Sequence, residues 1–197
     1  MLLAPAPALA LLAALLVAAA QPADGPQAPA TAPATQPASR PALPLPAHWH
    51  GHYVGTVELL RPGRGATADP VHMELIITPH PDDPLKVGWT IIYGTGDARQ
   101  ERPYELAAVP GFPNRFLMDE RNGIFVDHAL FGNTLVSEFR VNATLLLSRF
   151  ERTDGGIHVE IYSFQTTPSR RSGPRGTDID VESYPATTLQ RGLLRAK

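Results

Sequence analysis

The sequence predicts an all-β fold, an antiparallel up-and-down meander of about eight to ten strands that closes, or nearly closes, into a barrel. From His48 onward, short runs of alternating apolar and polar residues are separated by clusters of Gly, Pro, Asn and Asp, which is the pattern of strands and turns. No later segment keeps an apolar period of 3.6 residues over three turns, so long helices are not expected. Closure into a barrel protects the edge strands of a meander, and a two-sheet β-sandwich is the alternative.

The expected strands follow one another with short connections. They span residues 53–60, 73–78, 86–93, 102–109, 115–120, 124–128, 134–141, 143–152 and 157–164. Turns that contain Pro, with or without Gly, end the first, second and fourth. Asn122-Gly123 predicts a tight hairpin between the fifth and sixth, because Asn-Gly favours positive φ angles. Residues 186–197 fit either a short helix or a last strand.

The first 47 residues are expected to be export and tether segments. Residues 9–17 form an apolar run, and Ala18-Ala19-Ala20 offers the small side chains of a cleavage site, so residues 1–20 are predicted to be a signal peptide. Residues 21–47 are rich in Pro and Ala, which is typical of a disordered tether. The globular domain is therefore predicted to span residues 48–197 of a secreted or periplasmic protein, without a membrane span after cleavage.

Composition and motifs exclude or disfavour several classes of function. The chain contains no cysteine, so disulfides, thiolate metal sites and cysteine nucleophiles are excluded. It has 17 basic and 19 acidic residues and a formal net charge of −2, which gives no strong field for nucleic acid, so nucleic-acid binding is not expected. The common hydrolase, nucleotide and zinc-protease motifs are missing from the sequence, which favours a non-catalytic protein, and no motif specifies a cofactor.

The opening of the domain is similar to that of a known group of barrels. Trp49, Gly51, Tyr53 and Gly55 alternate at the start of the first expected strand. With the meander that follows, this pattern resembles the lipocalin-like, or calycin-type, small β-barrels, although here Trp precedes Gly. The resemblance implies an interior cavity that binds a small apolar molecule.

Side chains alternate between the two faces of a strand, so the sequence indicates which of them would line such an interior. Trp89 and Tyr93 share one face of the strand expected at 86–93, and Phe139 and Arg140 lie in the strand expected at 134–141. These four residues are the predicted ligand-binding residues.

A candidate metal site lies where the tether meets the domain. His48, His50 and His52 alternate, so on an extended segment their imidazoles share a face and are candidate ligands for zinc, copper or nickel. Neighbours on one face of a strand are about 7 Å apart, so convergence on one ion requires local bending.

Two further segments carry polar groups. Asp119, Glu120, Asp127 and His128 flank the expected hairpin and are candidates for acid–base chemistry, although charged residues are also ordinary beside a solvated turn. Residues 165–188 form a long polar segment, which is either a lid over a binding site or disordered.

Together these patterns predict a secreted β-barrel module, binding or structural and non-catalytic, whose partner is a small apolar ligand or an envelope component. One alternative is a metal-dependent or acid–base enzyme that uses the N-terminal histidines. The other is a scaffold that binds protein or polysaccharide at the cell envelope. A binder depends on its interior side chains, a metalloenzyme on the three histidines, and a scaffold on its tether.

Overall fold

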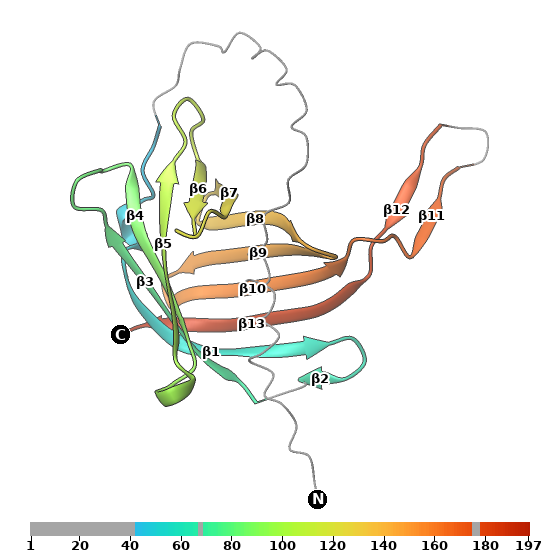
Figure 1. The fold of residues 1–197 in the computed structure, drawn as a ribbon, viewed down its shortest axis with the longest axis horizontal. Helices are drawn as coiled ribbons and strands as arrows, with labels where there is room; N and C mark the ends of the chain where they lie inside the picture. Colours follow the sequence, from blue (N-terminus) through green and yellow to red (C-terminus); the bar gives the residue numbers. More distant parts are fainter. Residues whose placement is uncertain (1–41, 67–68, 175–177) are drawn as a thin grey trace, which may run out of the picture.

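The computed structural model describes residues 42–66, 69–174 and 178–197, so the predicted signal peptide and the tether up to residue 41 lie outside the described residues. The described residues form two 3-10 helices and thirteen strands (Figure 1). The helices are η1 (Ala47–Trp49) and η2 (Gly96–Ala98). The strands are β1 (Gly51–Arg61), β2 (Gly65–Ala66), β3 (Val71–Pro79), β4 (Lys86–Tyr93), β5 (Gln100–Ala108), β6 (Arg115–Asp119), β7 (Phe125–Phe131), β8 (Thr134–Val141), β9 (Thr144–Thr153), β10 (Gly156–Gln165), β11 (Arg170–Ser172), β12 (Val181–Ser183) and β13 (Ala186–Ala196).

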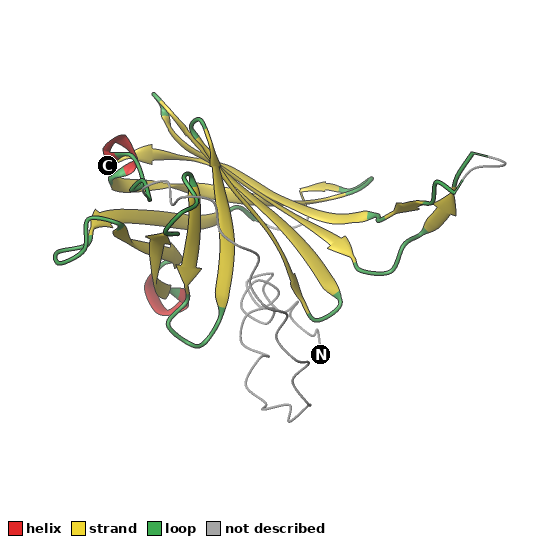
Figure 2. Ribbon diagram, turned by 90° about the horizontal axis from the view of Figure 1, so that it is seen from above, coloured by secondary structure: helices red, strands yellow, loops and turns green. Residues whose placement is uncertain are grey.

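Ten of these strands form a closed antiparallel barrel (Figures 1 and 2). β1 and β3 to β10 pair in sequence order, and β13 pairs with both β10 and β1, which closes the sheet. Among the described residues, β2 pairs only with the end of β1. The expected all-β meander and its closure are confirmed, and the sandwich alternative is wrong because strand pairing continues around the whole sheet.

The segment between β10 and β13 contains a second, separate pairing. β11 and β12 pair with each other and project away from the barrel (Figure 1). Residues 165–188 therefore contain a short hairpin, with residues 175–177 outside the described part. The last residues form β13, so the helix alternative for 186–197 is wrong. None of the helices found in the described ranges is long and apolar enough to cross a membrane.

Short turns set the order of the strands. Two-residue turns connect β7 to β8, β8 to β9 and β9 to β10. In the first two, Gly132 and Asn142 have φ angles of 58° and 51°, the region that two-residue hairpins require. The hairpin expected at Asn122-Gly123 joins β6 and β7, but its turn is longer. Arg121 (φ 58°) and Gly123 (φ 92°) adopt the positive φ angles there.

A group of aromatic rings packs in the apolar core near η1. Trp49 and Trp89 have ring centroids 6.4 Å apart, and Phe150 meets Trp89 edge-on at 5.3 Å. The Tyr53 hydroxyl donates a hydrogen bond to the Trp49 carbonyl at 3.0 Å, and the Arg152 guanidinium lies 5.4 Å from the Tyr53 ring centroid. These contacts fix η1 against this end of the barrel.

The folded part begins before His48. Leu45 is 3% exposed and belongs to the core, and Ala42 packs against it. Residues at the end of the expected tether therefore pack against the core, ahead of the expected start of the domain at residue 48.

Glycines allow β1 and β13 to approach each other at the closure. A Cβ atom on Gly55 would lie 2.3 Å from the Leu193 carbonyl oxygen, and one on Gly192 would lie 2.2 Å from the Thr56 carbonyl oxygen. Side chains at these two positions would force the paired backbones apart.

In a meander, alternate connections lie at the same end of the barrel. We call one end the η1 end, because it holds η1 and the β3–β4, β5–β6, β7–β8 and β9–β10 connections. We call the other the hairpin end, because it holds η2, the β6–β7 and β8–β9 turns and the β11–β12 hairpin.

Candidate functional site

The inner face of the barrel carries polar side chains toward the hairpin end. On β5, Arg102 and Tyr104 are the direct partners of Ile91 and Trp89 on β4, and direct partners on neighbouring strands share a face of the sheet. Because Ile91 and Trp89 belong to the core, Arg102 and Tyr104 face the interior.

These residues form a group that we call the mouth cluster: Tyr93, Arg102, Tyr104 and Glu120. The Arg102 guanidinium lies 5.9 Å from the centroid of the Tyr93 ring, within the range of a cation–π interaction. Tyr93 is 7% exposed, and the other three side chains are partly buried. Within the described residues, no carboxylate forms an ion pair with Arg102.

Burial governs the ionisation of the mouth cluster. It raises the pKa of Tyr93, and it also raises the pKa of Tyr104, which the nearby Glu120 raises further. Burial raises the pKa of the Glu120 carboxyl group as well, against the opposing effects of Asn122 and Arg102. The tyrosines are therefore neutral donors at neutral pH, and Arg102 supplies a positive charge in a partly desolvated setting.

Two serine hydroxyls and two indole N–H groups are also buried inside the barrel; the hydroxyls pair with each other, and the indole N–H groups have no acceptor among the described residues. The hydroxyls of Ser137 and Ser148 lie 2.6 Å apart and satisfy each other. The indole N–H groups of Trp49 and Trp89 are buried without an acceptor among the described residues. Since buried donors are normally paired, the Trp89 N–H next to Tyr104 is an unused donor on the inner face.

The candidate acid–base residues lie on two faces of the sheet. His128 is 5% exposed. Its Nδ1 lies 3.1 Å from the Val126 carbonyl oxygen, which accepts a hydrogen bond from it. Burial lowers its pKa to about 4, so the ring is neutral at neutral pH. Asp127 is exposed on the outer face, and Asp119 faces outward as well, while Glu120 belongs to the mouth cluster. The four residues do not form one site.

The predicted ligand-binding residues divide between the two faces. Trp89 and Tyr93 are inward and buried, and Phe139 is partly buried against the core. Arg140 is exposed on the outer face, because successive residues of β8 alternate. Arg102 was not predicted. The alternation of Arg102, Tyr104 and Leu106 along 102–109 was the signal that could have identified it.

The N-terminal histidines are not gathered around one point. η1 interrupts the expected extended segment, with His48 exposed and His50 partly buried. His52 Nε2 lies 2.5 Å from one oxygen of Glu74, and His72 Nε2 lies 3.2 Å from the other. Both hydrogen bonds lower the pKa of the Glu74 carboxyl group, and the bond with His72 has the larger effect. In the ranges that the structure describes, no group of three or more His, Asp or Glu side chains is placed to hold a metal ion.

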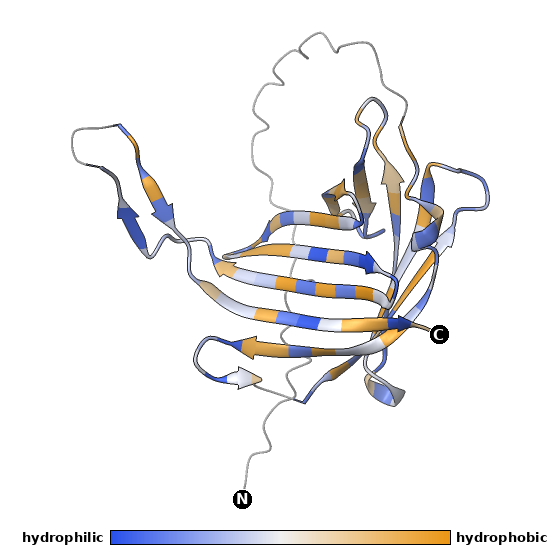
Figure 3. Ribbon diagram, turned by 180° about the vertical axis from the view of Figure 1, so that it is seen from behind, coloured by the Kyte–Doolittle hydropathy of each residue, from blue (hydrophilic) through white to orange (hydrophobic). Residues whose placement is uncertain are grey.

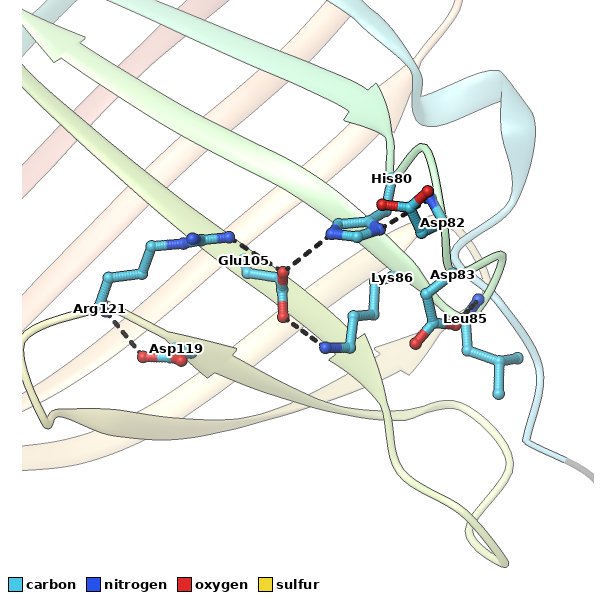
Figure 4. A network of polar contacts seen from close by, with 8 residues as sticks. All are labelled: His80, Asp82, Asp83, Leu85, Lys86, Glu105, Asp119 and Arg121. Carbon is cyan, nitrogen blue, oxygen red and sulfur yellow. Dashed lines mark hydrogen bonds and ion pairs between the residues drawn. The ribbon is translucent and has the colours of Figure 1, made fainter.

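A second polar network lies on the outer face around Glu105 (Figure 4). Its carboxylate is 12% exposed and pairs with Lys86 Nζ at 2.9 Å, Arg121 at 3.0 Å and His80 Nε2 at 3.4 Å. Glu105 in turn raises the pKa of Lys86. Asp119 accepts a hydrogen bond from the Arg121 backbone N–H at 2.7 Å. This network ties β4 and β5 to the β6–β7 turn, and both oxygens of Glu105 are already in contact with basic side chains.

Comparison of the chain with models of protein families, with characterised proteins and with solved structures finds no match.

Proposed function

We propose that this chain is a secreted or periplasmic binding module, without catalytic activity, that holds a small amphipathic molecule inside its barrel at the hairpin end. The observation that carries the proposal is Arg102, an inward guanidinium between Tyr93 and Tyr104 that has no carboxylate ion pair among the described residues. The resemblance to lipocalin-like barrels points to the same use of the interior.

The chemistry of the mouth cluster selects the polar part of the ligand. A guanidinium and two neutral tyrosine hydroxyls offer several donors, and charge-assisted bonds to a carboxylate or sulfate are the strongest that such donors make. Burial raises the pKa of Glu120, which favours its neutral form and weakens its competition for Arg102. An anionic head group beside Arg102 would compensate its charge.

The apolar side chains of the core would contact the remaining, apolar part of the ligand. Beyond Arg102 and Tyr104 most inner side chains are apolar, and Ile91, Trp89 and Phe139 lie among them or against them, while Ser137 and Ser148 satisfy each other. An apolar body next to these side chains and an anionic head beside Arg102 together describe an amphipathic anion.

Titration with a matched pair of probes tests this function. Decanoate and decan-1-ol share an apolar chain and differ in charge, and quenching of the chain's 2 tryptophans reports binding. We expect decanoate to bind more tightly. The loss of a charge-assisted hydrogen bond, worth about 1.5–3 kcal/mol, should weaken decanoate binding to Arg102→Gln by about 10- to 100-fold.

The exposed Arg140 offers a matched control. Arg140→Gln removes the same charge from the outer face and should bind decanoate like the unaltered chain. Failure of the unaltered chain to bind decanoate, or equal weakening in both variants, would refute the proposal.

A further inference from the structure

An apolar row crosses the outer face of the barrel near the hairpin end. Strand register aligns Leu147 on β9, Tyr162 on β10, Leu189 on β13 and Leu60 on β1. All four side chains are partly exposed, and the Tyr162 ring stacks on that of Phe164 with centroids 6.3 Å apart. Figure 3 shows hydrophobic residues in orange at the ends of β1, β9 and β10 nearest the β11–β12 hairpin. Since the outer face of a barrel in water is normally polar, this row indicates a surface that a partner covers.

A row of alternating charge runs beside it on the same four strands. Register aligns Arg149, Glu160, Arg191 and Glu58, each two residues away from the apolar row on its strand. Their side chains are 34%, 28%, 57% and 45% exposed. Arg149 pairs with Glu160 at 3.0 Å and Arg191 with Glu58 at 3.8 Å. The row reads plus, minus, plus, minus from β9 to β1.

We propose that this face joins two copies of the chain in a symmetric dimer. A two-fold axis parallel to the strands and between β10 and β13 reverses the order of the row in the facing copy. Arg149 then lies opposite the partner's Glu58, and Glu160 lies opposite the partner's Arg191. A row of four alternating charges is complementary to its own reverse at every position, and this complementarity identifies the partner as a second copy.

The same axis brings the apolar rows together. Leu147 lies opposite the partner's Leu60, and Tyr162 lies opposite the partner's Leu189. The contact thus buries apolar side chains beside a line of matched charges, the arrangement of an apolar centre with a polar rim that protein interfaces show.

Charge reversal tests the dimer by sedimentation velocity over a range of chain concentrations. Glu160→Arg alone places two arginines opposite each other at both symmetry-related positions, and Arg191→Glu alone does the same with two glutamates. Since like charges in an interface cost several kcal/mol, each variant should weaken dimerisation by about 100-fold or more. The double variant Glu160→Arg with Arg191→Glu should dimerise again.

Mixing the two single variants provides the sharpest measurement. In a heterodimer of one Glu160→Arg copy and one Arg191→Glu copy, every opposed pair in the row again has opposite charges, so the mixture should dimerise while neither variant does alone. A folding defect cannot be repaired by mixing, and circular dichroism checks the fold of each variant. Every sample contains residues 1–41, so any association through that segment is the same in all of them and cannot explain a difference between the variants. A monomeric unaltered chain, or a mixture that stays monomeric, would overturn the proposal.

Discussion

Lowering the pH from 7.5 to 5 should destabilise the barrel mainly through His128. Its ring is buried at 5% exposure, and burial lowers its pKa to about 4 from an ordinary value of 6.5. The unfolded chain therefore binds a proton at a pH where the folded barrel does not, so stability falls as the pH falls from about 6.5 toward 4.

The size of the effect follows from the two pKa values. One pKa unit corresponds to about 1.4 kcal/mol, so complete protonation below pH 4 removes about 3 kcal/mol of stability. At pH 5 the loss is about 2 kcal/mol, and at pH 7.5 it is close to zero.

Guanidinium chloride unfolding, followed by the fluorescence of the buried Trp49 and Trp89, measures this loss. His128→Gln removes the titrating ring, and its stability should fall by about 2 kcal/mol less than that of the unaltered chain between pH 7.5 and 5. The exposed His158 is the matched control, and His158→Gln should behave like the unaltered chain. An equal fall in the unaltered chain and in His128→Gln would refute the reasoning.

Three further substitutions test how the barrel is held together, each by chemical or thermal unfolding. Gly192→Ala should cost about 3 kcal/mol, since its Cβ would meet the Thr56 carbonyl oxygen, whereas Gly155→Ala in an open turn should be tolerated; equal stabilities would argue against close approach at the closure. Leu45→Ala should cost about 2–4 kcal/mol and the exposed Leu43→Ala almost nothing, and a neutral Leu45→Ala would place residues 42–47 outside the domain. Glu105→Gln should lower the melting temperature more than Glu101→Gln, because the half-buried Glu105 carboxylate contacts Lys86, Arg121 and His80, whereas Glu101 is 47% exposed and contacts Arg99; the reverse order would contradict the role of the Glu105 network.

Local patterns predicted the strands better than they predicted the contacts between them. The bounds of β4 and β8 match their predicted ranges, because alternating apolar residues end at clear turn signals. The pairing of β1 with β13 was less visible, since it joins distant segments and depends on glycines, which ordinarily weaken strands. The hairpin predicted at Asn122-Gly123 forms, but five residues, 120–124, connect its strands where three were expected, because β6 ends at Asp119 and β7 begins at Phe125.

The candidate site was predicted only in part for a related reason. Alternation placed Trp89 and Tyr93 inside, because the apolar side of β4 is unambiguous. The sequence leaves the inward side of β8 ambiguous at the adjacent residues Phe139 and Arg140, and Arg140 lies on the outer face. Arg102 is harder to predict because a charged residue in a strand normally faces water; its alternation with Tyr104 and Leu106 is the signal in the sequence, and its pairing with Ile91 shows that it faces the core.

The most direct test of interior binding is native mass spectrometry of the chain produced in its own cell and purified without an affinity tag. We expect a stoichiometric extra mass in the small-molecule range that Arg140→Gln retains and Arg102→Gln loses. A bare protein mass in repeated preparations, or an extra mass that Arg102→Gln retains in full, would contradict binding at the mouth cluster.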